Sequence, residues 1–165
     1  MKTLSILRHA KSSWSDASLS DKERPLNKRG KRDAPMMGQR LKTSAIRPSL
    51  IVSSPAVRAW TTAKVVAREI SYPREFLQRD DRLYLAGVGQ LLDVVSEQDA
   101  GFNSIMFVGH NPGLTDFANL LVPDITPNVP TCGLVAVEID TDDWNLRGNP
   151  TCRLLLYDYP KRIVT

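Results

Sequence analysis

The chain has few of the residues from which disulfide frameworks and zinc sites are built. Its two cysteines, Cys132 and Cys152, are not spaced as a C-x-x-C pair, so the sequence indicates neither a zinc site nor a redox dithiol. Both lie in strand-like segments, where a free cysteine packs as a small apolar side chain. We therefore expect both thiols to be free, as they are in a reducing compartment.

Long apolar runs are also missing. No stretch approaches the roughly 20 apolar residues that cross a bilayer. The run at residues 4–7 is too short for the core of a secretion signal, and no small-residue cleavage site follows it. The sequence thus predicts a cytoplasmic protein without membrane contact. A chain of 165 residues is long enough to build one core, so we expect a single domain over residues 1–165.

The formal net charge of +4 is modest but unevenly distributed. Six lysines and arginines lie between Lys22 and Arg32, against one glutamate. Three interpretations are open: a solvated helix face, a field that steers an anionic substrate, or a patch that binds nucleic acid. No aromatic residue lies among these charges, so nucleic-acid bases would have no side chain on which to stack. We therefore expect no nucleic-acid partner.

Strand-like and helix-like segments alternate along the chain. The expected buried strands lie at residues 2–7, 49–54 and 104–110, and the expected helices at residues 27–44, 54–70, 88–98 and 111–122. The segment at residues 74–85 fits either an extended strand or a loop. Residues 132–139 and 152–159 have the pattern of two further strands, joined by a polar turn near Gly148. This order predicts an α/β fold of three layers, with a mostly parallel central sheet, helices on both faces and an antiparallel C-terminal strand pair.

Capping residues and prolines mark where the helices should begin. Asn27 is expected to cap the helix at residues 27–44, in which Pro35 predicts a kink or a displaced start. Ser54 and Asn111 are each followed by a proline, which is the usual start signal of a helix. Such helix starts present unpaired backbone N–H groups that favour an anion.

The chain's two histidines occupy equivalent places. His9 follows the strand-like run "TLSILR", and His110 follows "SIMFVG". Arg58 lies one turn into the helix that follows a third such strand, and Arg8 directly precedes His9. In open α/β sheets, ligands bind outside the carboxyl ends of the strands. We therefore expect these four side chains to meet in one crevice, although a single histidine at such a place is more often structural.

The chemistry of these four residues favours phosphoryl transfer. Two guanidinium groups can grip a dianionic phosphoryl group through paired hydrogen bonds. Their charge should also lower the pKa of the nearby histidines and keep a neutral imidazole ready as a nucleophile. The alternative is a metal site, because histidine is a common metal ligand. No HxxxH, HxH or HD pair occurs, and Arg8 would repel a divalent cation, so we expect no metal and no cofactor.

Four segments carry a family resemblance: "LRHAKSSW", "RPLNKRG", "SSPAVRAWTTA" and "VGHNPGL". They resemble the signature segments of the histidine phosphatase superfamily, which has the phosphoglycerate-mutase-like fold. The details are similar to its short bacterial branch, the SixA-like phosphohistidine phosphatases. The likeness covers residues 1–121, and the order and spacing of the four segments make it specific. The C-terminal strands suit the fold but carry no signature.

The resemblance implies a role for each matching position. His9 would be the nucleophile and would pass through a phosphohistidine intermediate. Arg8, Arg58 and His110 would complete the phosphate pocket and stabilise the transferring charge. Ser12 and Arg24 would add phosphate contacts, or else Ser12 caps a turn and Arg24 is solvated.

Two departures from the family pattern affect the expected chemistry. Ala10 follows His9, where most of the superfamily has glycine, although the short branch tolerates other residues there. The general acid of the family matches the stretch "DDRLY", in which Asp81 is the best match and Asp80 is in reserve. The alternative is that both carboxylates are surface residues of a loop.

The strength of the general acid affects which leaving group, and so which class of substrate, we expect. An alkoxide leaving group benefits from a delivered proton, whereas a phosphohistidine leaves as imidazole once solvent has protonated its ring. The connections between the expected elements also leave little room for a lid, and an open site suits a phosphorylated protein. We expect a phosphatase of protein phosphohistidine that releases inorganic phosphate. The alternatives are a phosphatase of small phosphate esters and a non-catalytic module that binds phosphoproteins; a mutase fits an open pocket poorly.

Overall fold

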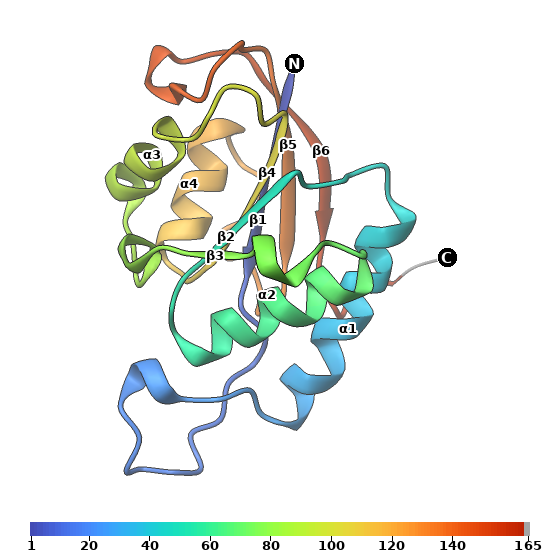
Figure 1. The fold of residues 1–165 in the computed structure, drawn as a ribbon, viewed down its shortest axis with the longest axis vertical. Coiled ribbons are helices and arrows are strands. Elements are labelled where there is room, and N and C mark those ends of the chain that lie inside the picture. Colours follow the sequence, from blue (N-terminus) through green and yellow to red (C-terminus); the bar gives the residue numbers. More distant parts are fainter. Residues whose placement is uncertain (164–165) are drawn as a thin grey trace.

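Six strands form one sheet in the computed structural model, which describes residues 1–163 (Figure 1). The strands are β1 Lys2–Arg8, β2 Leu50–Ser53, β3 Gln78–Arg79, β4 Ser104–Gly109, β5 Leu134–Ile139 and β6 Cys152–Asp158. Their order across the sheet is β3-β2-β4-β1-β5-β6. The pairs β3–β2, β2–β4 and β4–β1 are parallel, while β5 is antiparallel to both β1 and β6. The expected mostly parallel sheet with an antiparallel C-terminal pair is confirmed.

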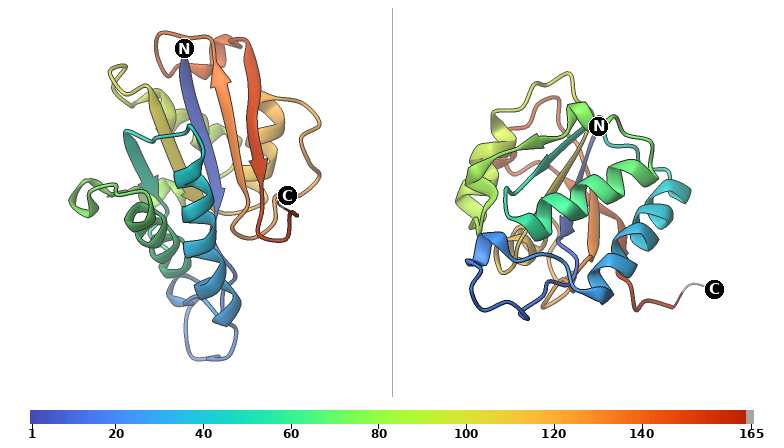
Figure 2. Two further views of the ribbon diagram at one scale, coloured as in Figure 1. Left: turned by 90° about the vertical axis from the view of Figure 1, so that its right-hand side faces the viewer. Right: turned by 60° about the horizontal axis from the view of Figure 1, so that its bottom comes forward.

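Helices cover both faces of the sheet (Figure 2). They are α1 Lys28–Thr43, α2 Val57–Glu69, α3 Val88–Ser96 and α4 Gly113–Leu121. Four short 3₁₀ turns accompany them: η1 Asp21–Glu23, η2 Arg74–Phe76, η3 Asp81–Leu83 and η4 Leu146–Gly148. Side chains alternate along a strand, so Leu4 and Ile6 of β1 join the core under α3 and α4, whereas Leu7 joins the core under α1 and α2. Within residues 1–163, no helix is long and apolar enough to cross a membrane.

Helix α1 begins where its cap predicts. The side chain of Asn27 accepts a hydrogen bond from the Gly30 N–H at 2.9 Å, and the helix starts at the next residue, Lys28. It continues without a break through Pro35, so the displaced start that a proline can cause does not occur. The buried residues around this position, among them Ala34 and Met37, pack against the core and hold the helix together despite the missing N–H.

Helices α2 and α4 begin later than their serine–proline and asparagine–proline signals predict. α2 starts at Val57 because the Ser54 hydroxyl accepts the N–H of Ala56, which forms a turn ahead of the helix. α4 starts at Gly113, and the side chain of Asn111 accepts from the backbone N–H of a residue inside its first turn. The expected caps Ser54 and Asn111 were therefore wrong by two residues and one residue, since Ala56 and Pro112 hold these positions. The two side chains organise the preceding turns instead.

Two further expectations concern residues 74–85 and the two cysteines. Residues 74–85 combine η2, the short strand β3 and η3, so neither a long strand nor a plain loop describes them. Cys132 and Cys152 are both free, as expected.

The carboxyl ends of three neighbouring strands lie side by side. Arg8 of β1 pairs with Gly109 of β4, and Ser53 of β2 pairs with Val108 of β4. The residues that follow these strands therefore emerge at one edge, at the bottom of Figure 1. The connection at residues 9–27 also extends beyond that edge and is longer than the short connections that the sequence led us to expect.

Candidate active site

The two histidines face each other at this edge of the sheet. The centroids of the His9 and His110 rings are 5.1 Å apart, and the rings are tilted by 54°. The backbone N–H of His9 donates to the Gly109 carbonyl at 3.0 Å, which ties the residue after β1 to the end of β4. His9 is 8% and His110 3% exposed, so both rings lie in a largely dry environment. Strand register thus brings together two residues that are far apart in the chain.

Hydrogen bonds indicate which nitrogen of each imidazole carries the proton. The Nδ1 of His9 lies 2.7 Å from the Ala10 carbonyl, an acceptor, so we assign the proton to Nδ1 and a free lone pair to Nε2. The Nη2–H of Arg58 points at Nδ1 of His110 at 3.4 Å, and Nε2 of His110 lies 2.8 Å from the Ser54 hydroxyl. His110 therefore donates to Ser54 through Nε2–H. His9 is the ring whose free Nε2 can attack an electrophile.

Burial keeps both imidazoles neutral. It lowers the pKa of His9 to about 4, with further lowering by Arg58 and Arg8 and a partly opposing effect of the Ala10 carbonyl. Burial likewise lowers the pKa of His110 to about 3, helped by His9 and Arg58. The sequence predicted a lowered pKa and attributed it to the neighbouring cations, but desolvation is the larger cause. At neutral pH both rings are uncharged.

Arg58 and Arg8 approach the histidines from two sides. Arg58 comes from the first turn of α2, is 4% exposed, and contributes Nη2 to the contact with His110. Arg8 ends β1, and its Nη1 donates to the Val129 carbonyl at 2.9 Å. The buried Nε–H of Arg8 has no partner among residues 1–163, which leaves a donor that an anion can use. Together they place positive charge beside the two histidines.

Ser12 and Arg24 lie in the same network. Arg24 is 8% exposed, so it is not the solvated side chain that the sequence left open. Its Nη2 donates to the Ser12 hydroxyl, and its Nε donates to the Ser13 carbonyl at 3.2 Å. Its guanidinium carbon also lies 3.3 Å from the ring centroid of Trp14, a stacked arrangement. These contacts hold the connection at residues 9–27 against the site.

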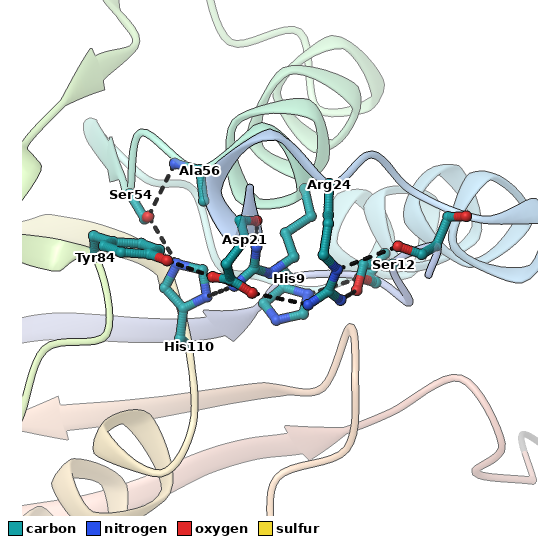
Figure 3. Close-up of polar contacts among 11 residues, drawn as sticks. His9, Ser12, Asp21, Arg24, Ser54, Ala56, Tyr84 and His110 are labelled. Atoms are coloured by element: carbon teal, nitrogen blue, oxygen red, sulfur yellow. Dashed lines mark hydrogen bonds and ion pairs between the residues drawn. The ribbon is translucent and has the colours of Figure 1, made fainter. Parts of the chain in front are cut away.

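Asp21 and Tyr84 belong to the site although the sequence analysis did not select them (Figure 3). Arg24 and Arg58 each donate to the Asp21 carboxylate at 2.9 Å, and the Tyr84 hydroxyl donates to the same group. The Tyr84 hydroxyl is the main cause that lowers the pKa of Asp21 to about 2, with Arg58 and Arg24 adding to it. The Tyr84 ring stands edge-on to His110, 5.4 Å between centroids. Asp21 directly precedes the basic cluster, and that was its one sequence signal.

Asp80 and Asp81, the candidates for the general acid, are not joined to this network. The Asp80 carboxylate accepts from the N–H of Arg82 at 2.9 Å and forms an ion pair with its side chain at 2.8 Å. Arg82 also pairs with Glu97 at 2.7 Å, so its guanidinium group is shared between these two carboxylates. Asp81 is solvent-exposed, and within residues 1–163 its carboxylate has neither a hydrogen bond nor an ion pair. The structure therefore brings Asp21, and not Asp80 or Asp81, to the arginines.

No group of three or more histidine, cysteine, aspartate or glutamate side chains in residues 1–163 is arranged to hold a metal ion. What the site offers is a neutral imidazole with a free Nε2, a second neutral imidazole, and three guanidinium groups. This set suits an anionic phosphoryl group and a nitrogen nucleophile.

Comparison with known proteins identifies the class. Residues 4–84 match the histidine phosphatase superfamily (branch 1). An uncharacterized chloroplast protein of Arabidopsis thaliana is 30% identical over 154 residues, which cover 87% of this chain and 69% of that protein. The chain belongs to the histidine phosphatase superfamily.

Solved structures place the fold within this superfamily. A SixA-type protein from Agrobacterium tumefaciens superposes with a TM-score of 0.82 at 25% identity, covering 96% of this chain and 98% of that one. The protein histidine phosphatase SixA in complex with tungstate superposes with a TM-score of 0.76 at 23% identity, covering 96% and 97%. The α/β fold is thus the SixA-like form of the phosphoglycerate-mutase-like fold, as the sequence predicted.

Proposed function

We propose that this chain is a phosphatase that removes the phosphoryl group from phosphohistidine on a protein, with His9 as nucleophile and without a metal ion. The observation that carries the proposal is the neutral His9 ring, whose Nε2 is free while its Nδ1–H is bound to Ala10. It lies in a pocket of buried guanidinium groups. Membership of the histidine phosphatase superfamily supports the phosphatase activity.

In the first step, the lone pair of His9 Nε2 attacks phosphorus and forms a new P–N bond. The P–N bond to the substrate imidazole breaks, and its electron pair returns to that ring, which leaves as neutral imidazole if its other nitrogen carries a proton. Arg8, Arg58 and Arg24 offset the negative charge on the phosphoryl oxygens during the transfer. Arg58 also donates toward Nδ1 of His110, so the second imidazole stays fixed beside the reacting group.

In the second step, water attacks the phosphorus of phospho-His9. The P–N bond breaks and its electron pair returns to His9 Nε2. The water oxygen and its two protons leave with the phosphoryl group as dihydrogen phosphate. The Nδ1–H of His9 stays bound to the Ala10 carbonyl throughout, which keeps the ring in one orientation. The ring's low pKa then favours its return to the neutral state.

The carboxylates near the site support a P–N substrate over a P–O substrate. An alkoxide needs a protonated acid close to the leaving oxygen. Asp80 is engaged with Arg82, Asp81 is exposed, and Asp21 is ionised because its pKa is about 2. Asp21 is thus an anion at neutral pH, and neither Asp80 nor Asp81 is joined to the network around the histidines.

The exposure of Asp21 beside the arginines supports a protein substrate. The connection at residues 9–27 is long, yet the side chain that it brings over the arginines, Asp21, is still 42% exposed. A phosphohistidine ring on a protein surface could therefore reach the pocket without closure of a lid.

A single-turnover experiment tests the proposal. Incubation with a radiolabelled phosphohistidine peptide in the presence of a chelator should label the protein with an acid-labile, alkali-stable phosphate. The His9→Ala variant should remain folded and unlabelled. A phosphatase of small phosphate esters would label faster from an aryl phosphate than from the peptide. A non-catalytic binding module would retain the peptide without any label, and either result would contradict the proposal.

A further inference from the structure

Asp21 is more exposed than the two arginines that bind its carboxylate. Its side chain is 42% exposed, while its partner Arg58 is 5% and its partner Arg24 is 9% exposed. The carboxylate thus lies on the solvent side of the guanidinium groups. In Figure 3 the carboxylate lies between Tyr84 and Arg24, with its hydrogen bonds drawn as dashed lines. A leaving group departs from the phosphorus on the side opposite His9, and Asp21 is the carboxylate that Arg24 and Arg58 hold at the site.

The Asp21 carboxylate also has capacity for one more hydrogen bond. An ionised carboxylate offers about four acceptor positions. Oδ2 accepts from Arg58 and Tyr84, whereas Oδ1 accepts from Arg24 alone among residues 1–163. One acceptor position on Oδ1 is left for a donor from outside. The three existing bonds hold the group in place, so little further ordering is needed for it to accept a fourth.

The same contacts make the group an acceptor and not a donor. The Tyr84 hydroxyl and the two arginines lower the pKa of Asp21 to about 2, so it carries a negative charge throughout the neutral range. It cannot deliver a proton to an oxygen leaving group, as a general acid does. It can accept a hydrogen bond from a leaving group that has its own N–H.

We propose that Asp21 determines the specificity for nitrogen leaving groups, by accepting a hydrogen bond from the N–H of the departing imidazole or amine. This inference rests on the proposed function and names the substrate bond that the site selects. It assigns Asp21 a direct contact with the leaving group.

The chemistry of the two bond types explains the selectivity. A phosphorylated imidazole leaves readily only when its second ring nitrogen is protonated. A carboxylate beside that N–H favours the protonated ring, and the N–H stays with the ring when the P–N electron pair returns to it. A phosphate ester has no such N–H, and its leaving oxygen gains negative charge, which the Asp21 carboxylate repels.

The test compares two small substrates, so that no protein contact contributes. Phosphoramidate carries a nitrogen leaving group, and para-nitrophenyl phosphate carries an oxygen leaving group. We expect Asp21→Asn to lower kcat/KM for phosphoramidate about tenfold or more relative to kcat/KM for para-nitrophenyl phosphate, which is the size of a lost hydrogen bond to a charged group. The matched control is Asp16→Asn in the same connection, whose carboxylate accepts hydrogen bonds from Ser18 alone among residues 1–163; it should affect neither substrate.

An equal loss on both substrates in Asp21→Asn would mean that Asp21 only holds Arg24 and Arg58 in place, and would overturn the inference. A measurement on the unmodified protein covers the case in which the variant does not fold. If no residue of the enzyme protonates the leaving oxygen, kcat/KM should be about tenfold or more lower for phenyl phosphate than for para-nitrophenyl phosphate, because phenolate is the more basic leaving group. Equal kcat/KM values for the two esters would show that the enzyme donates a proton to the leaving oxygen, and would also overturn the inference about Asp21.

These outcomes are distinct from failure of the proposed function. If the unmodified protein forms no His9 phosphoenzyme from phosphoramidate or a phosphohistidine peptide, the proposed function fails, whatever Asp21 does. If it forms the phosphoenzyme but Asp21→Asn keeps the ratio between the two substrates, only the role of Asp21 fails.

Discussion

Burial of His9 and His110 makes the free energy of unfolding depend on pH. In the unfolded chain both rings take up protons near pH 6.5, whereas the folded chain protonates them at a pKa of about 4 and about 3. Between these values the unfolded state binds more protons, so a fall in pH from 6.5 to 4 favours unfolding. Above pH 7 both rings are neutral in both states and contribute no slope.

We therefore expect the urea midpoint to fall steadily from pH 6.5 to pH 4.5 and to be flat between pH 7 and pH 8. His9→Gln should reduce this slope, because one of the two buried imidazoles is then missing. Proton NMR gives an independent measurement, since the two imidazole C–H signals should not titrate near pH 6.5 in the folded protein. A midpoint that is constant from pH 7 to pH 4.5 would contradict the assigned burial effect.

The sequence could indicate the site residues that lie at the ends of strands, but not those that lie in irregular segments. His9, Arg8 and His110 directly follow or end buried strands, and strand register alone brings them together. Asp21 and Tyr84 reach the site through the path of two irregular segments, residues 9–27 and 80–87. No periodicity encodes such a path. The family resemblance of the stretch DDRLY favoured Asp81, which the structure leaves in solvent.

At the scale of elements, the start of α4 is fixed by close packing of backbone. A Cβ atom on Gly113 would overlap the carbonyl oxygen of Ala86, two residues after Tyr84. The turn that carries Tyr84 is thus packed directly against the helix that follows His110. Glycine is needed here because of space, since its φ is not positive.

Gly113→Ala should therefore destabilise the fold by about 1–3 kcal/mol, the usual effect of overpacking. The measurement is urea unfolding followed by circular dichroism. The matched control is Gly89→Ala in α3, where a Cβ would meet nothing within 4 Å. The control should be unchanged or slightly more stable, because alanine favours helices. Equal stability of the two variants would show that α4 can move away from Ala86 without loss.

The elements themselves were predictable, but two of their boundaries were not. The period of apolar residues placed every long helix and every strand except β3. The starts of α2 and α4 moved because Ser54 and Asn111 have other partners: the Ser54 hydroxyl lies 2.8 Å from His110, and the Asn111 side chain accepts from Thr115. A capping side chain cannot be identified from sequence when a tertiary contact uses it.

At the scale of the whole molecule, the site joins segments that are distant in the chain. Its cations come from the end of β1, from the connection at residues 9–27 and from the first turn of α2, and its second histidine follows β4. Alternating segments were enough to predict a parallel sheet with helices on both faces. They did not reveal the strand order β3-β2-β4-β1-β5-β6, in which β1 and β2 flank β4. That order is what brings the three strand ends together.

An anion bound among these cations would link all four segments, so inorganic phosphate should stabilise the folded protein as a whole. At a phosphate concentration about 100 times its Kd, mass action adds about 2.7 kcal/mol to the free energy of unfolding. Thermal unfolding in phosphate and in chloride of equal ionic strength measures the effect. Arg58→Ala should lose the rise in Tm that phosphate causes. Arg153→Ala, an exposed arginine of β6 paired with Glu138, should keep it. Phosphate and chloride acting alike, or Arg58→Ala responding as the unmodified chain does, would show that the guanidinium groups do not form one anion site.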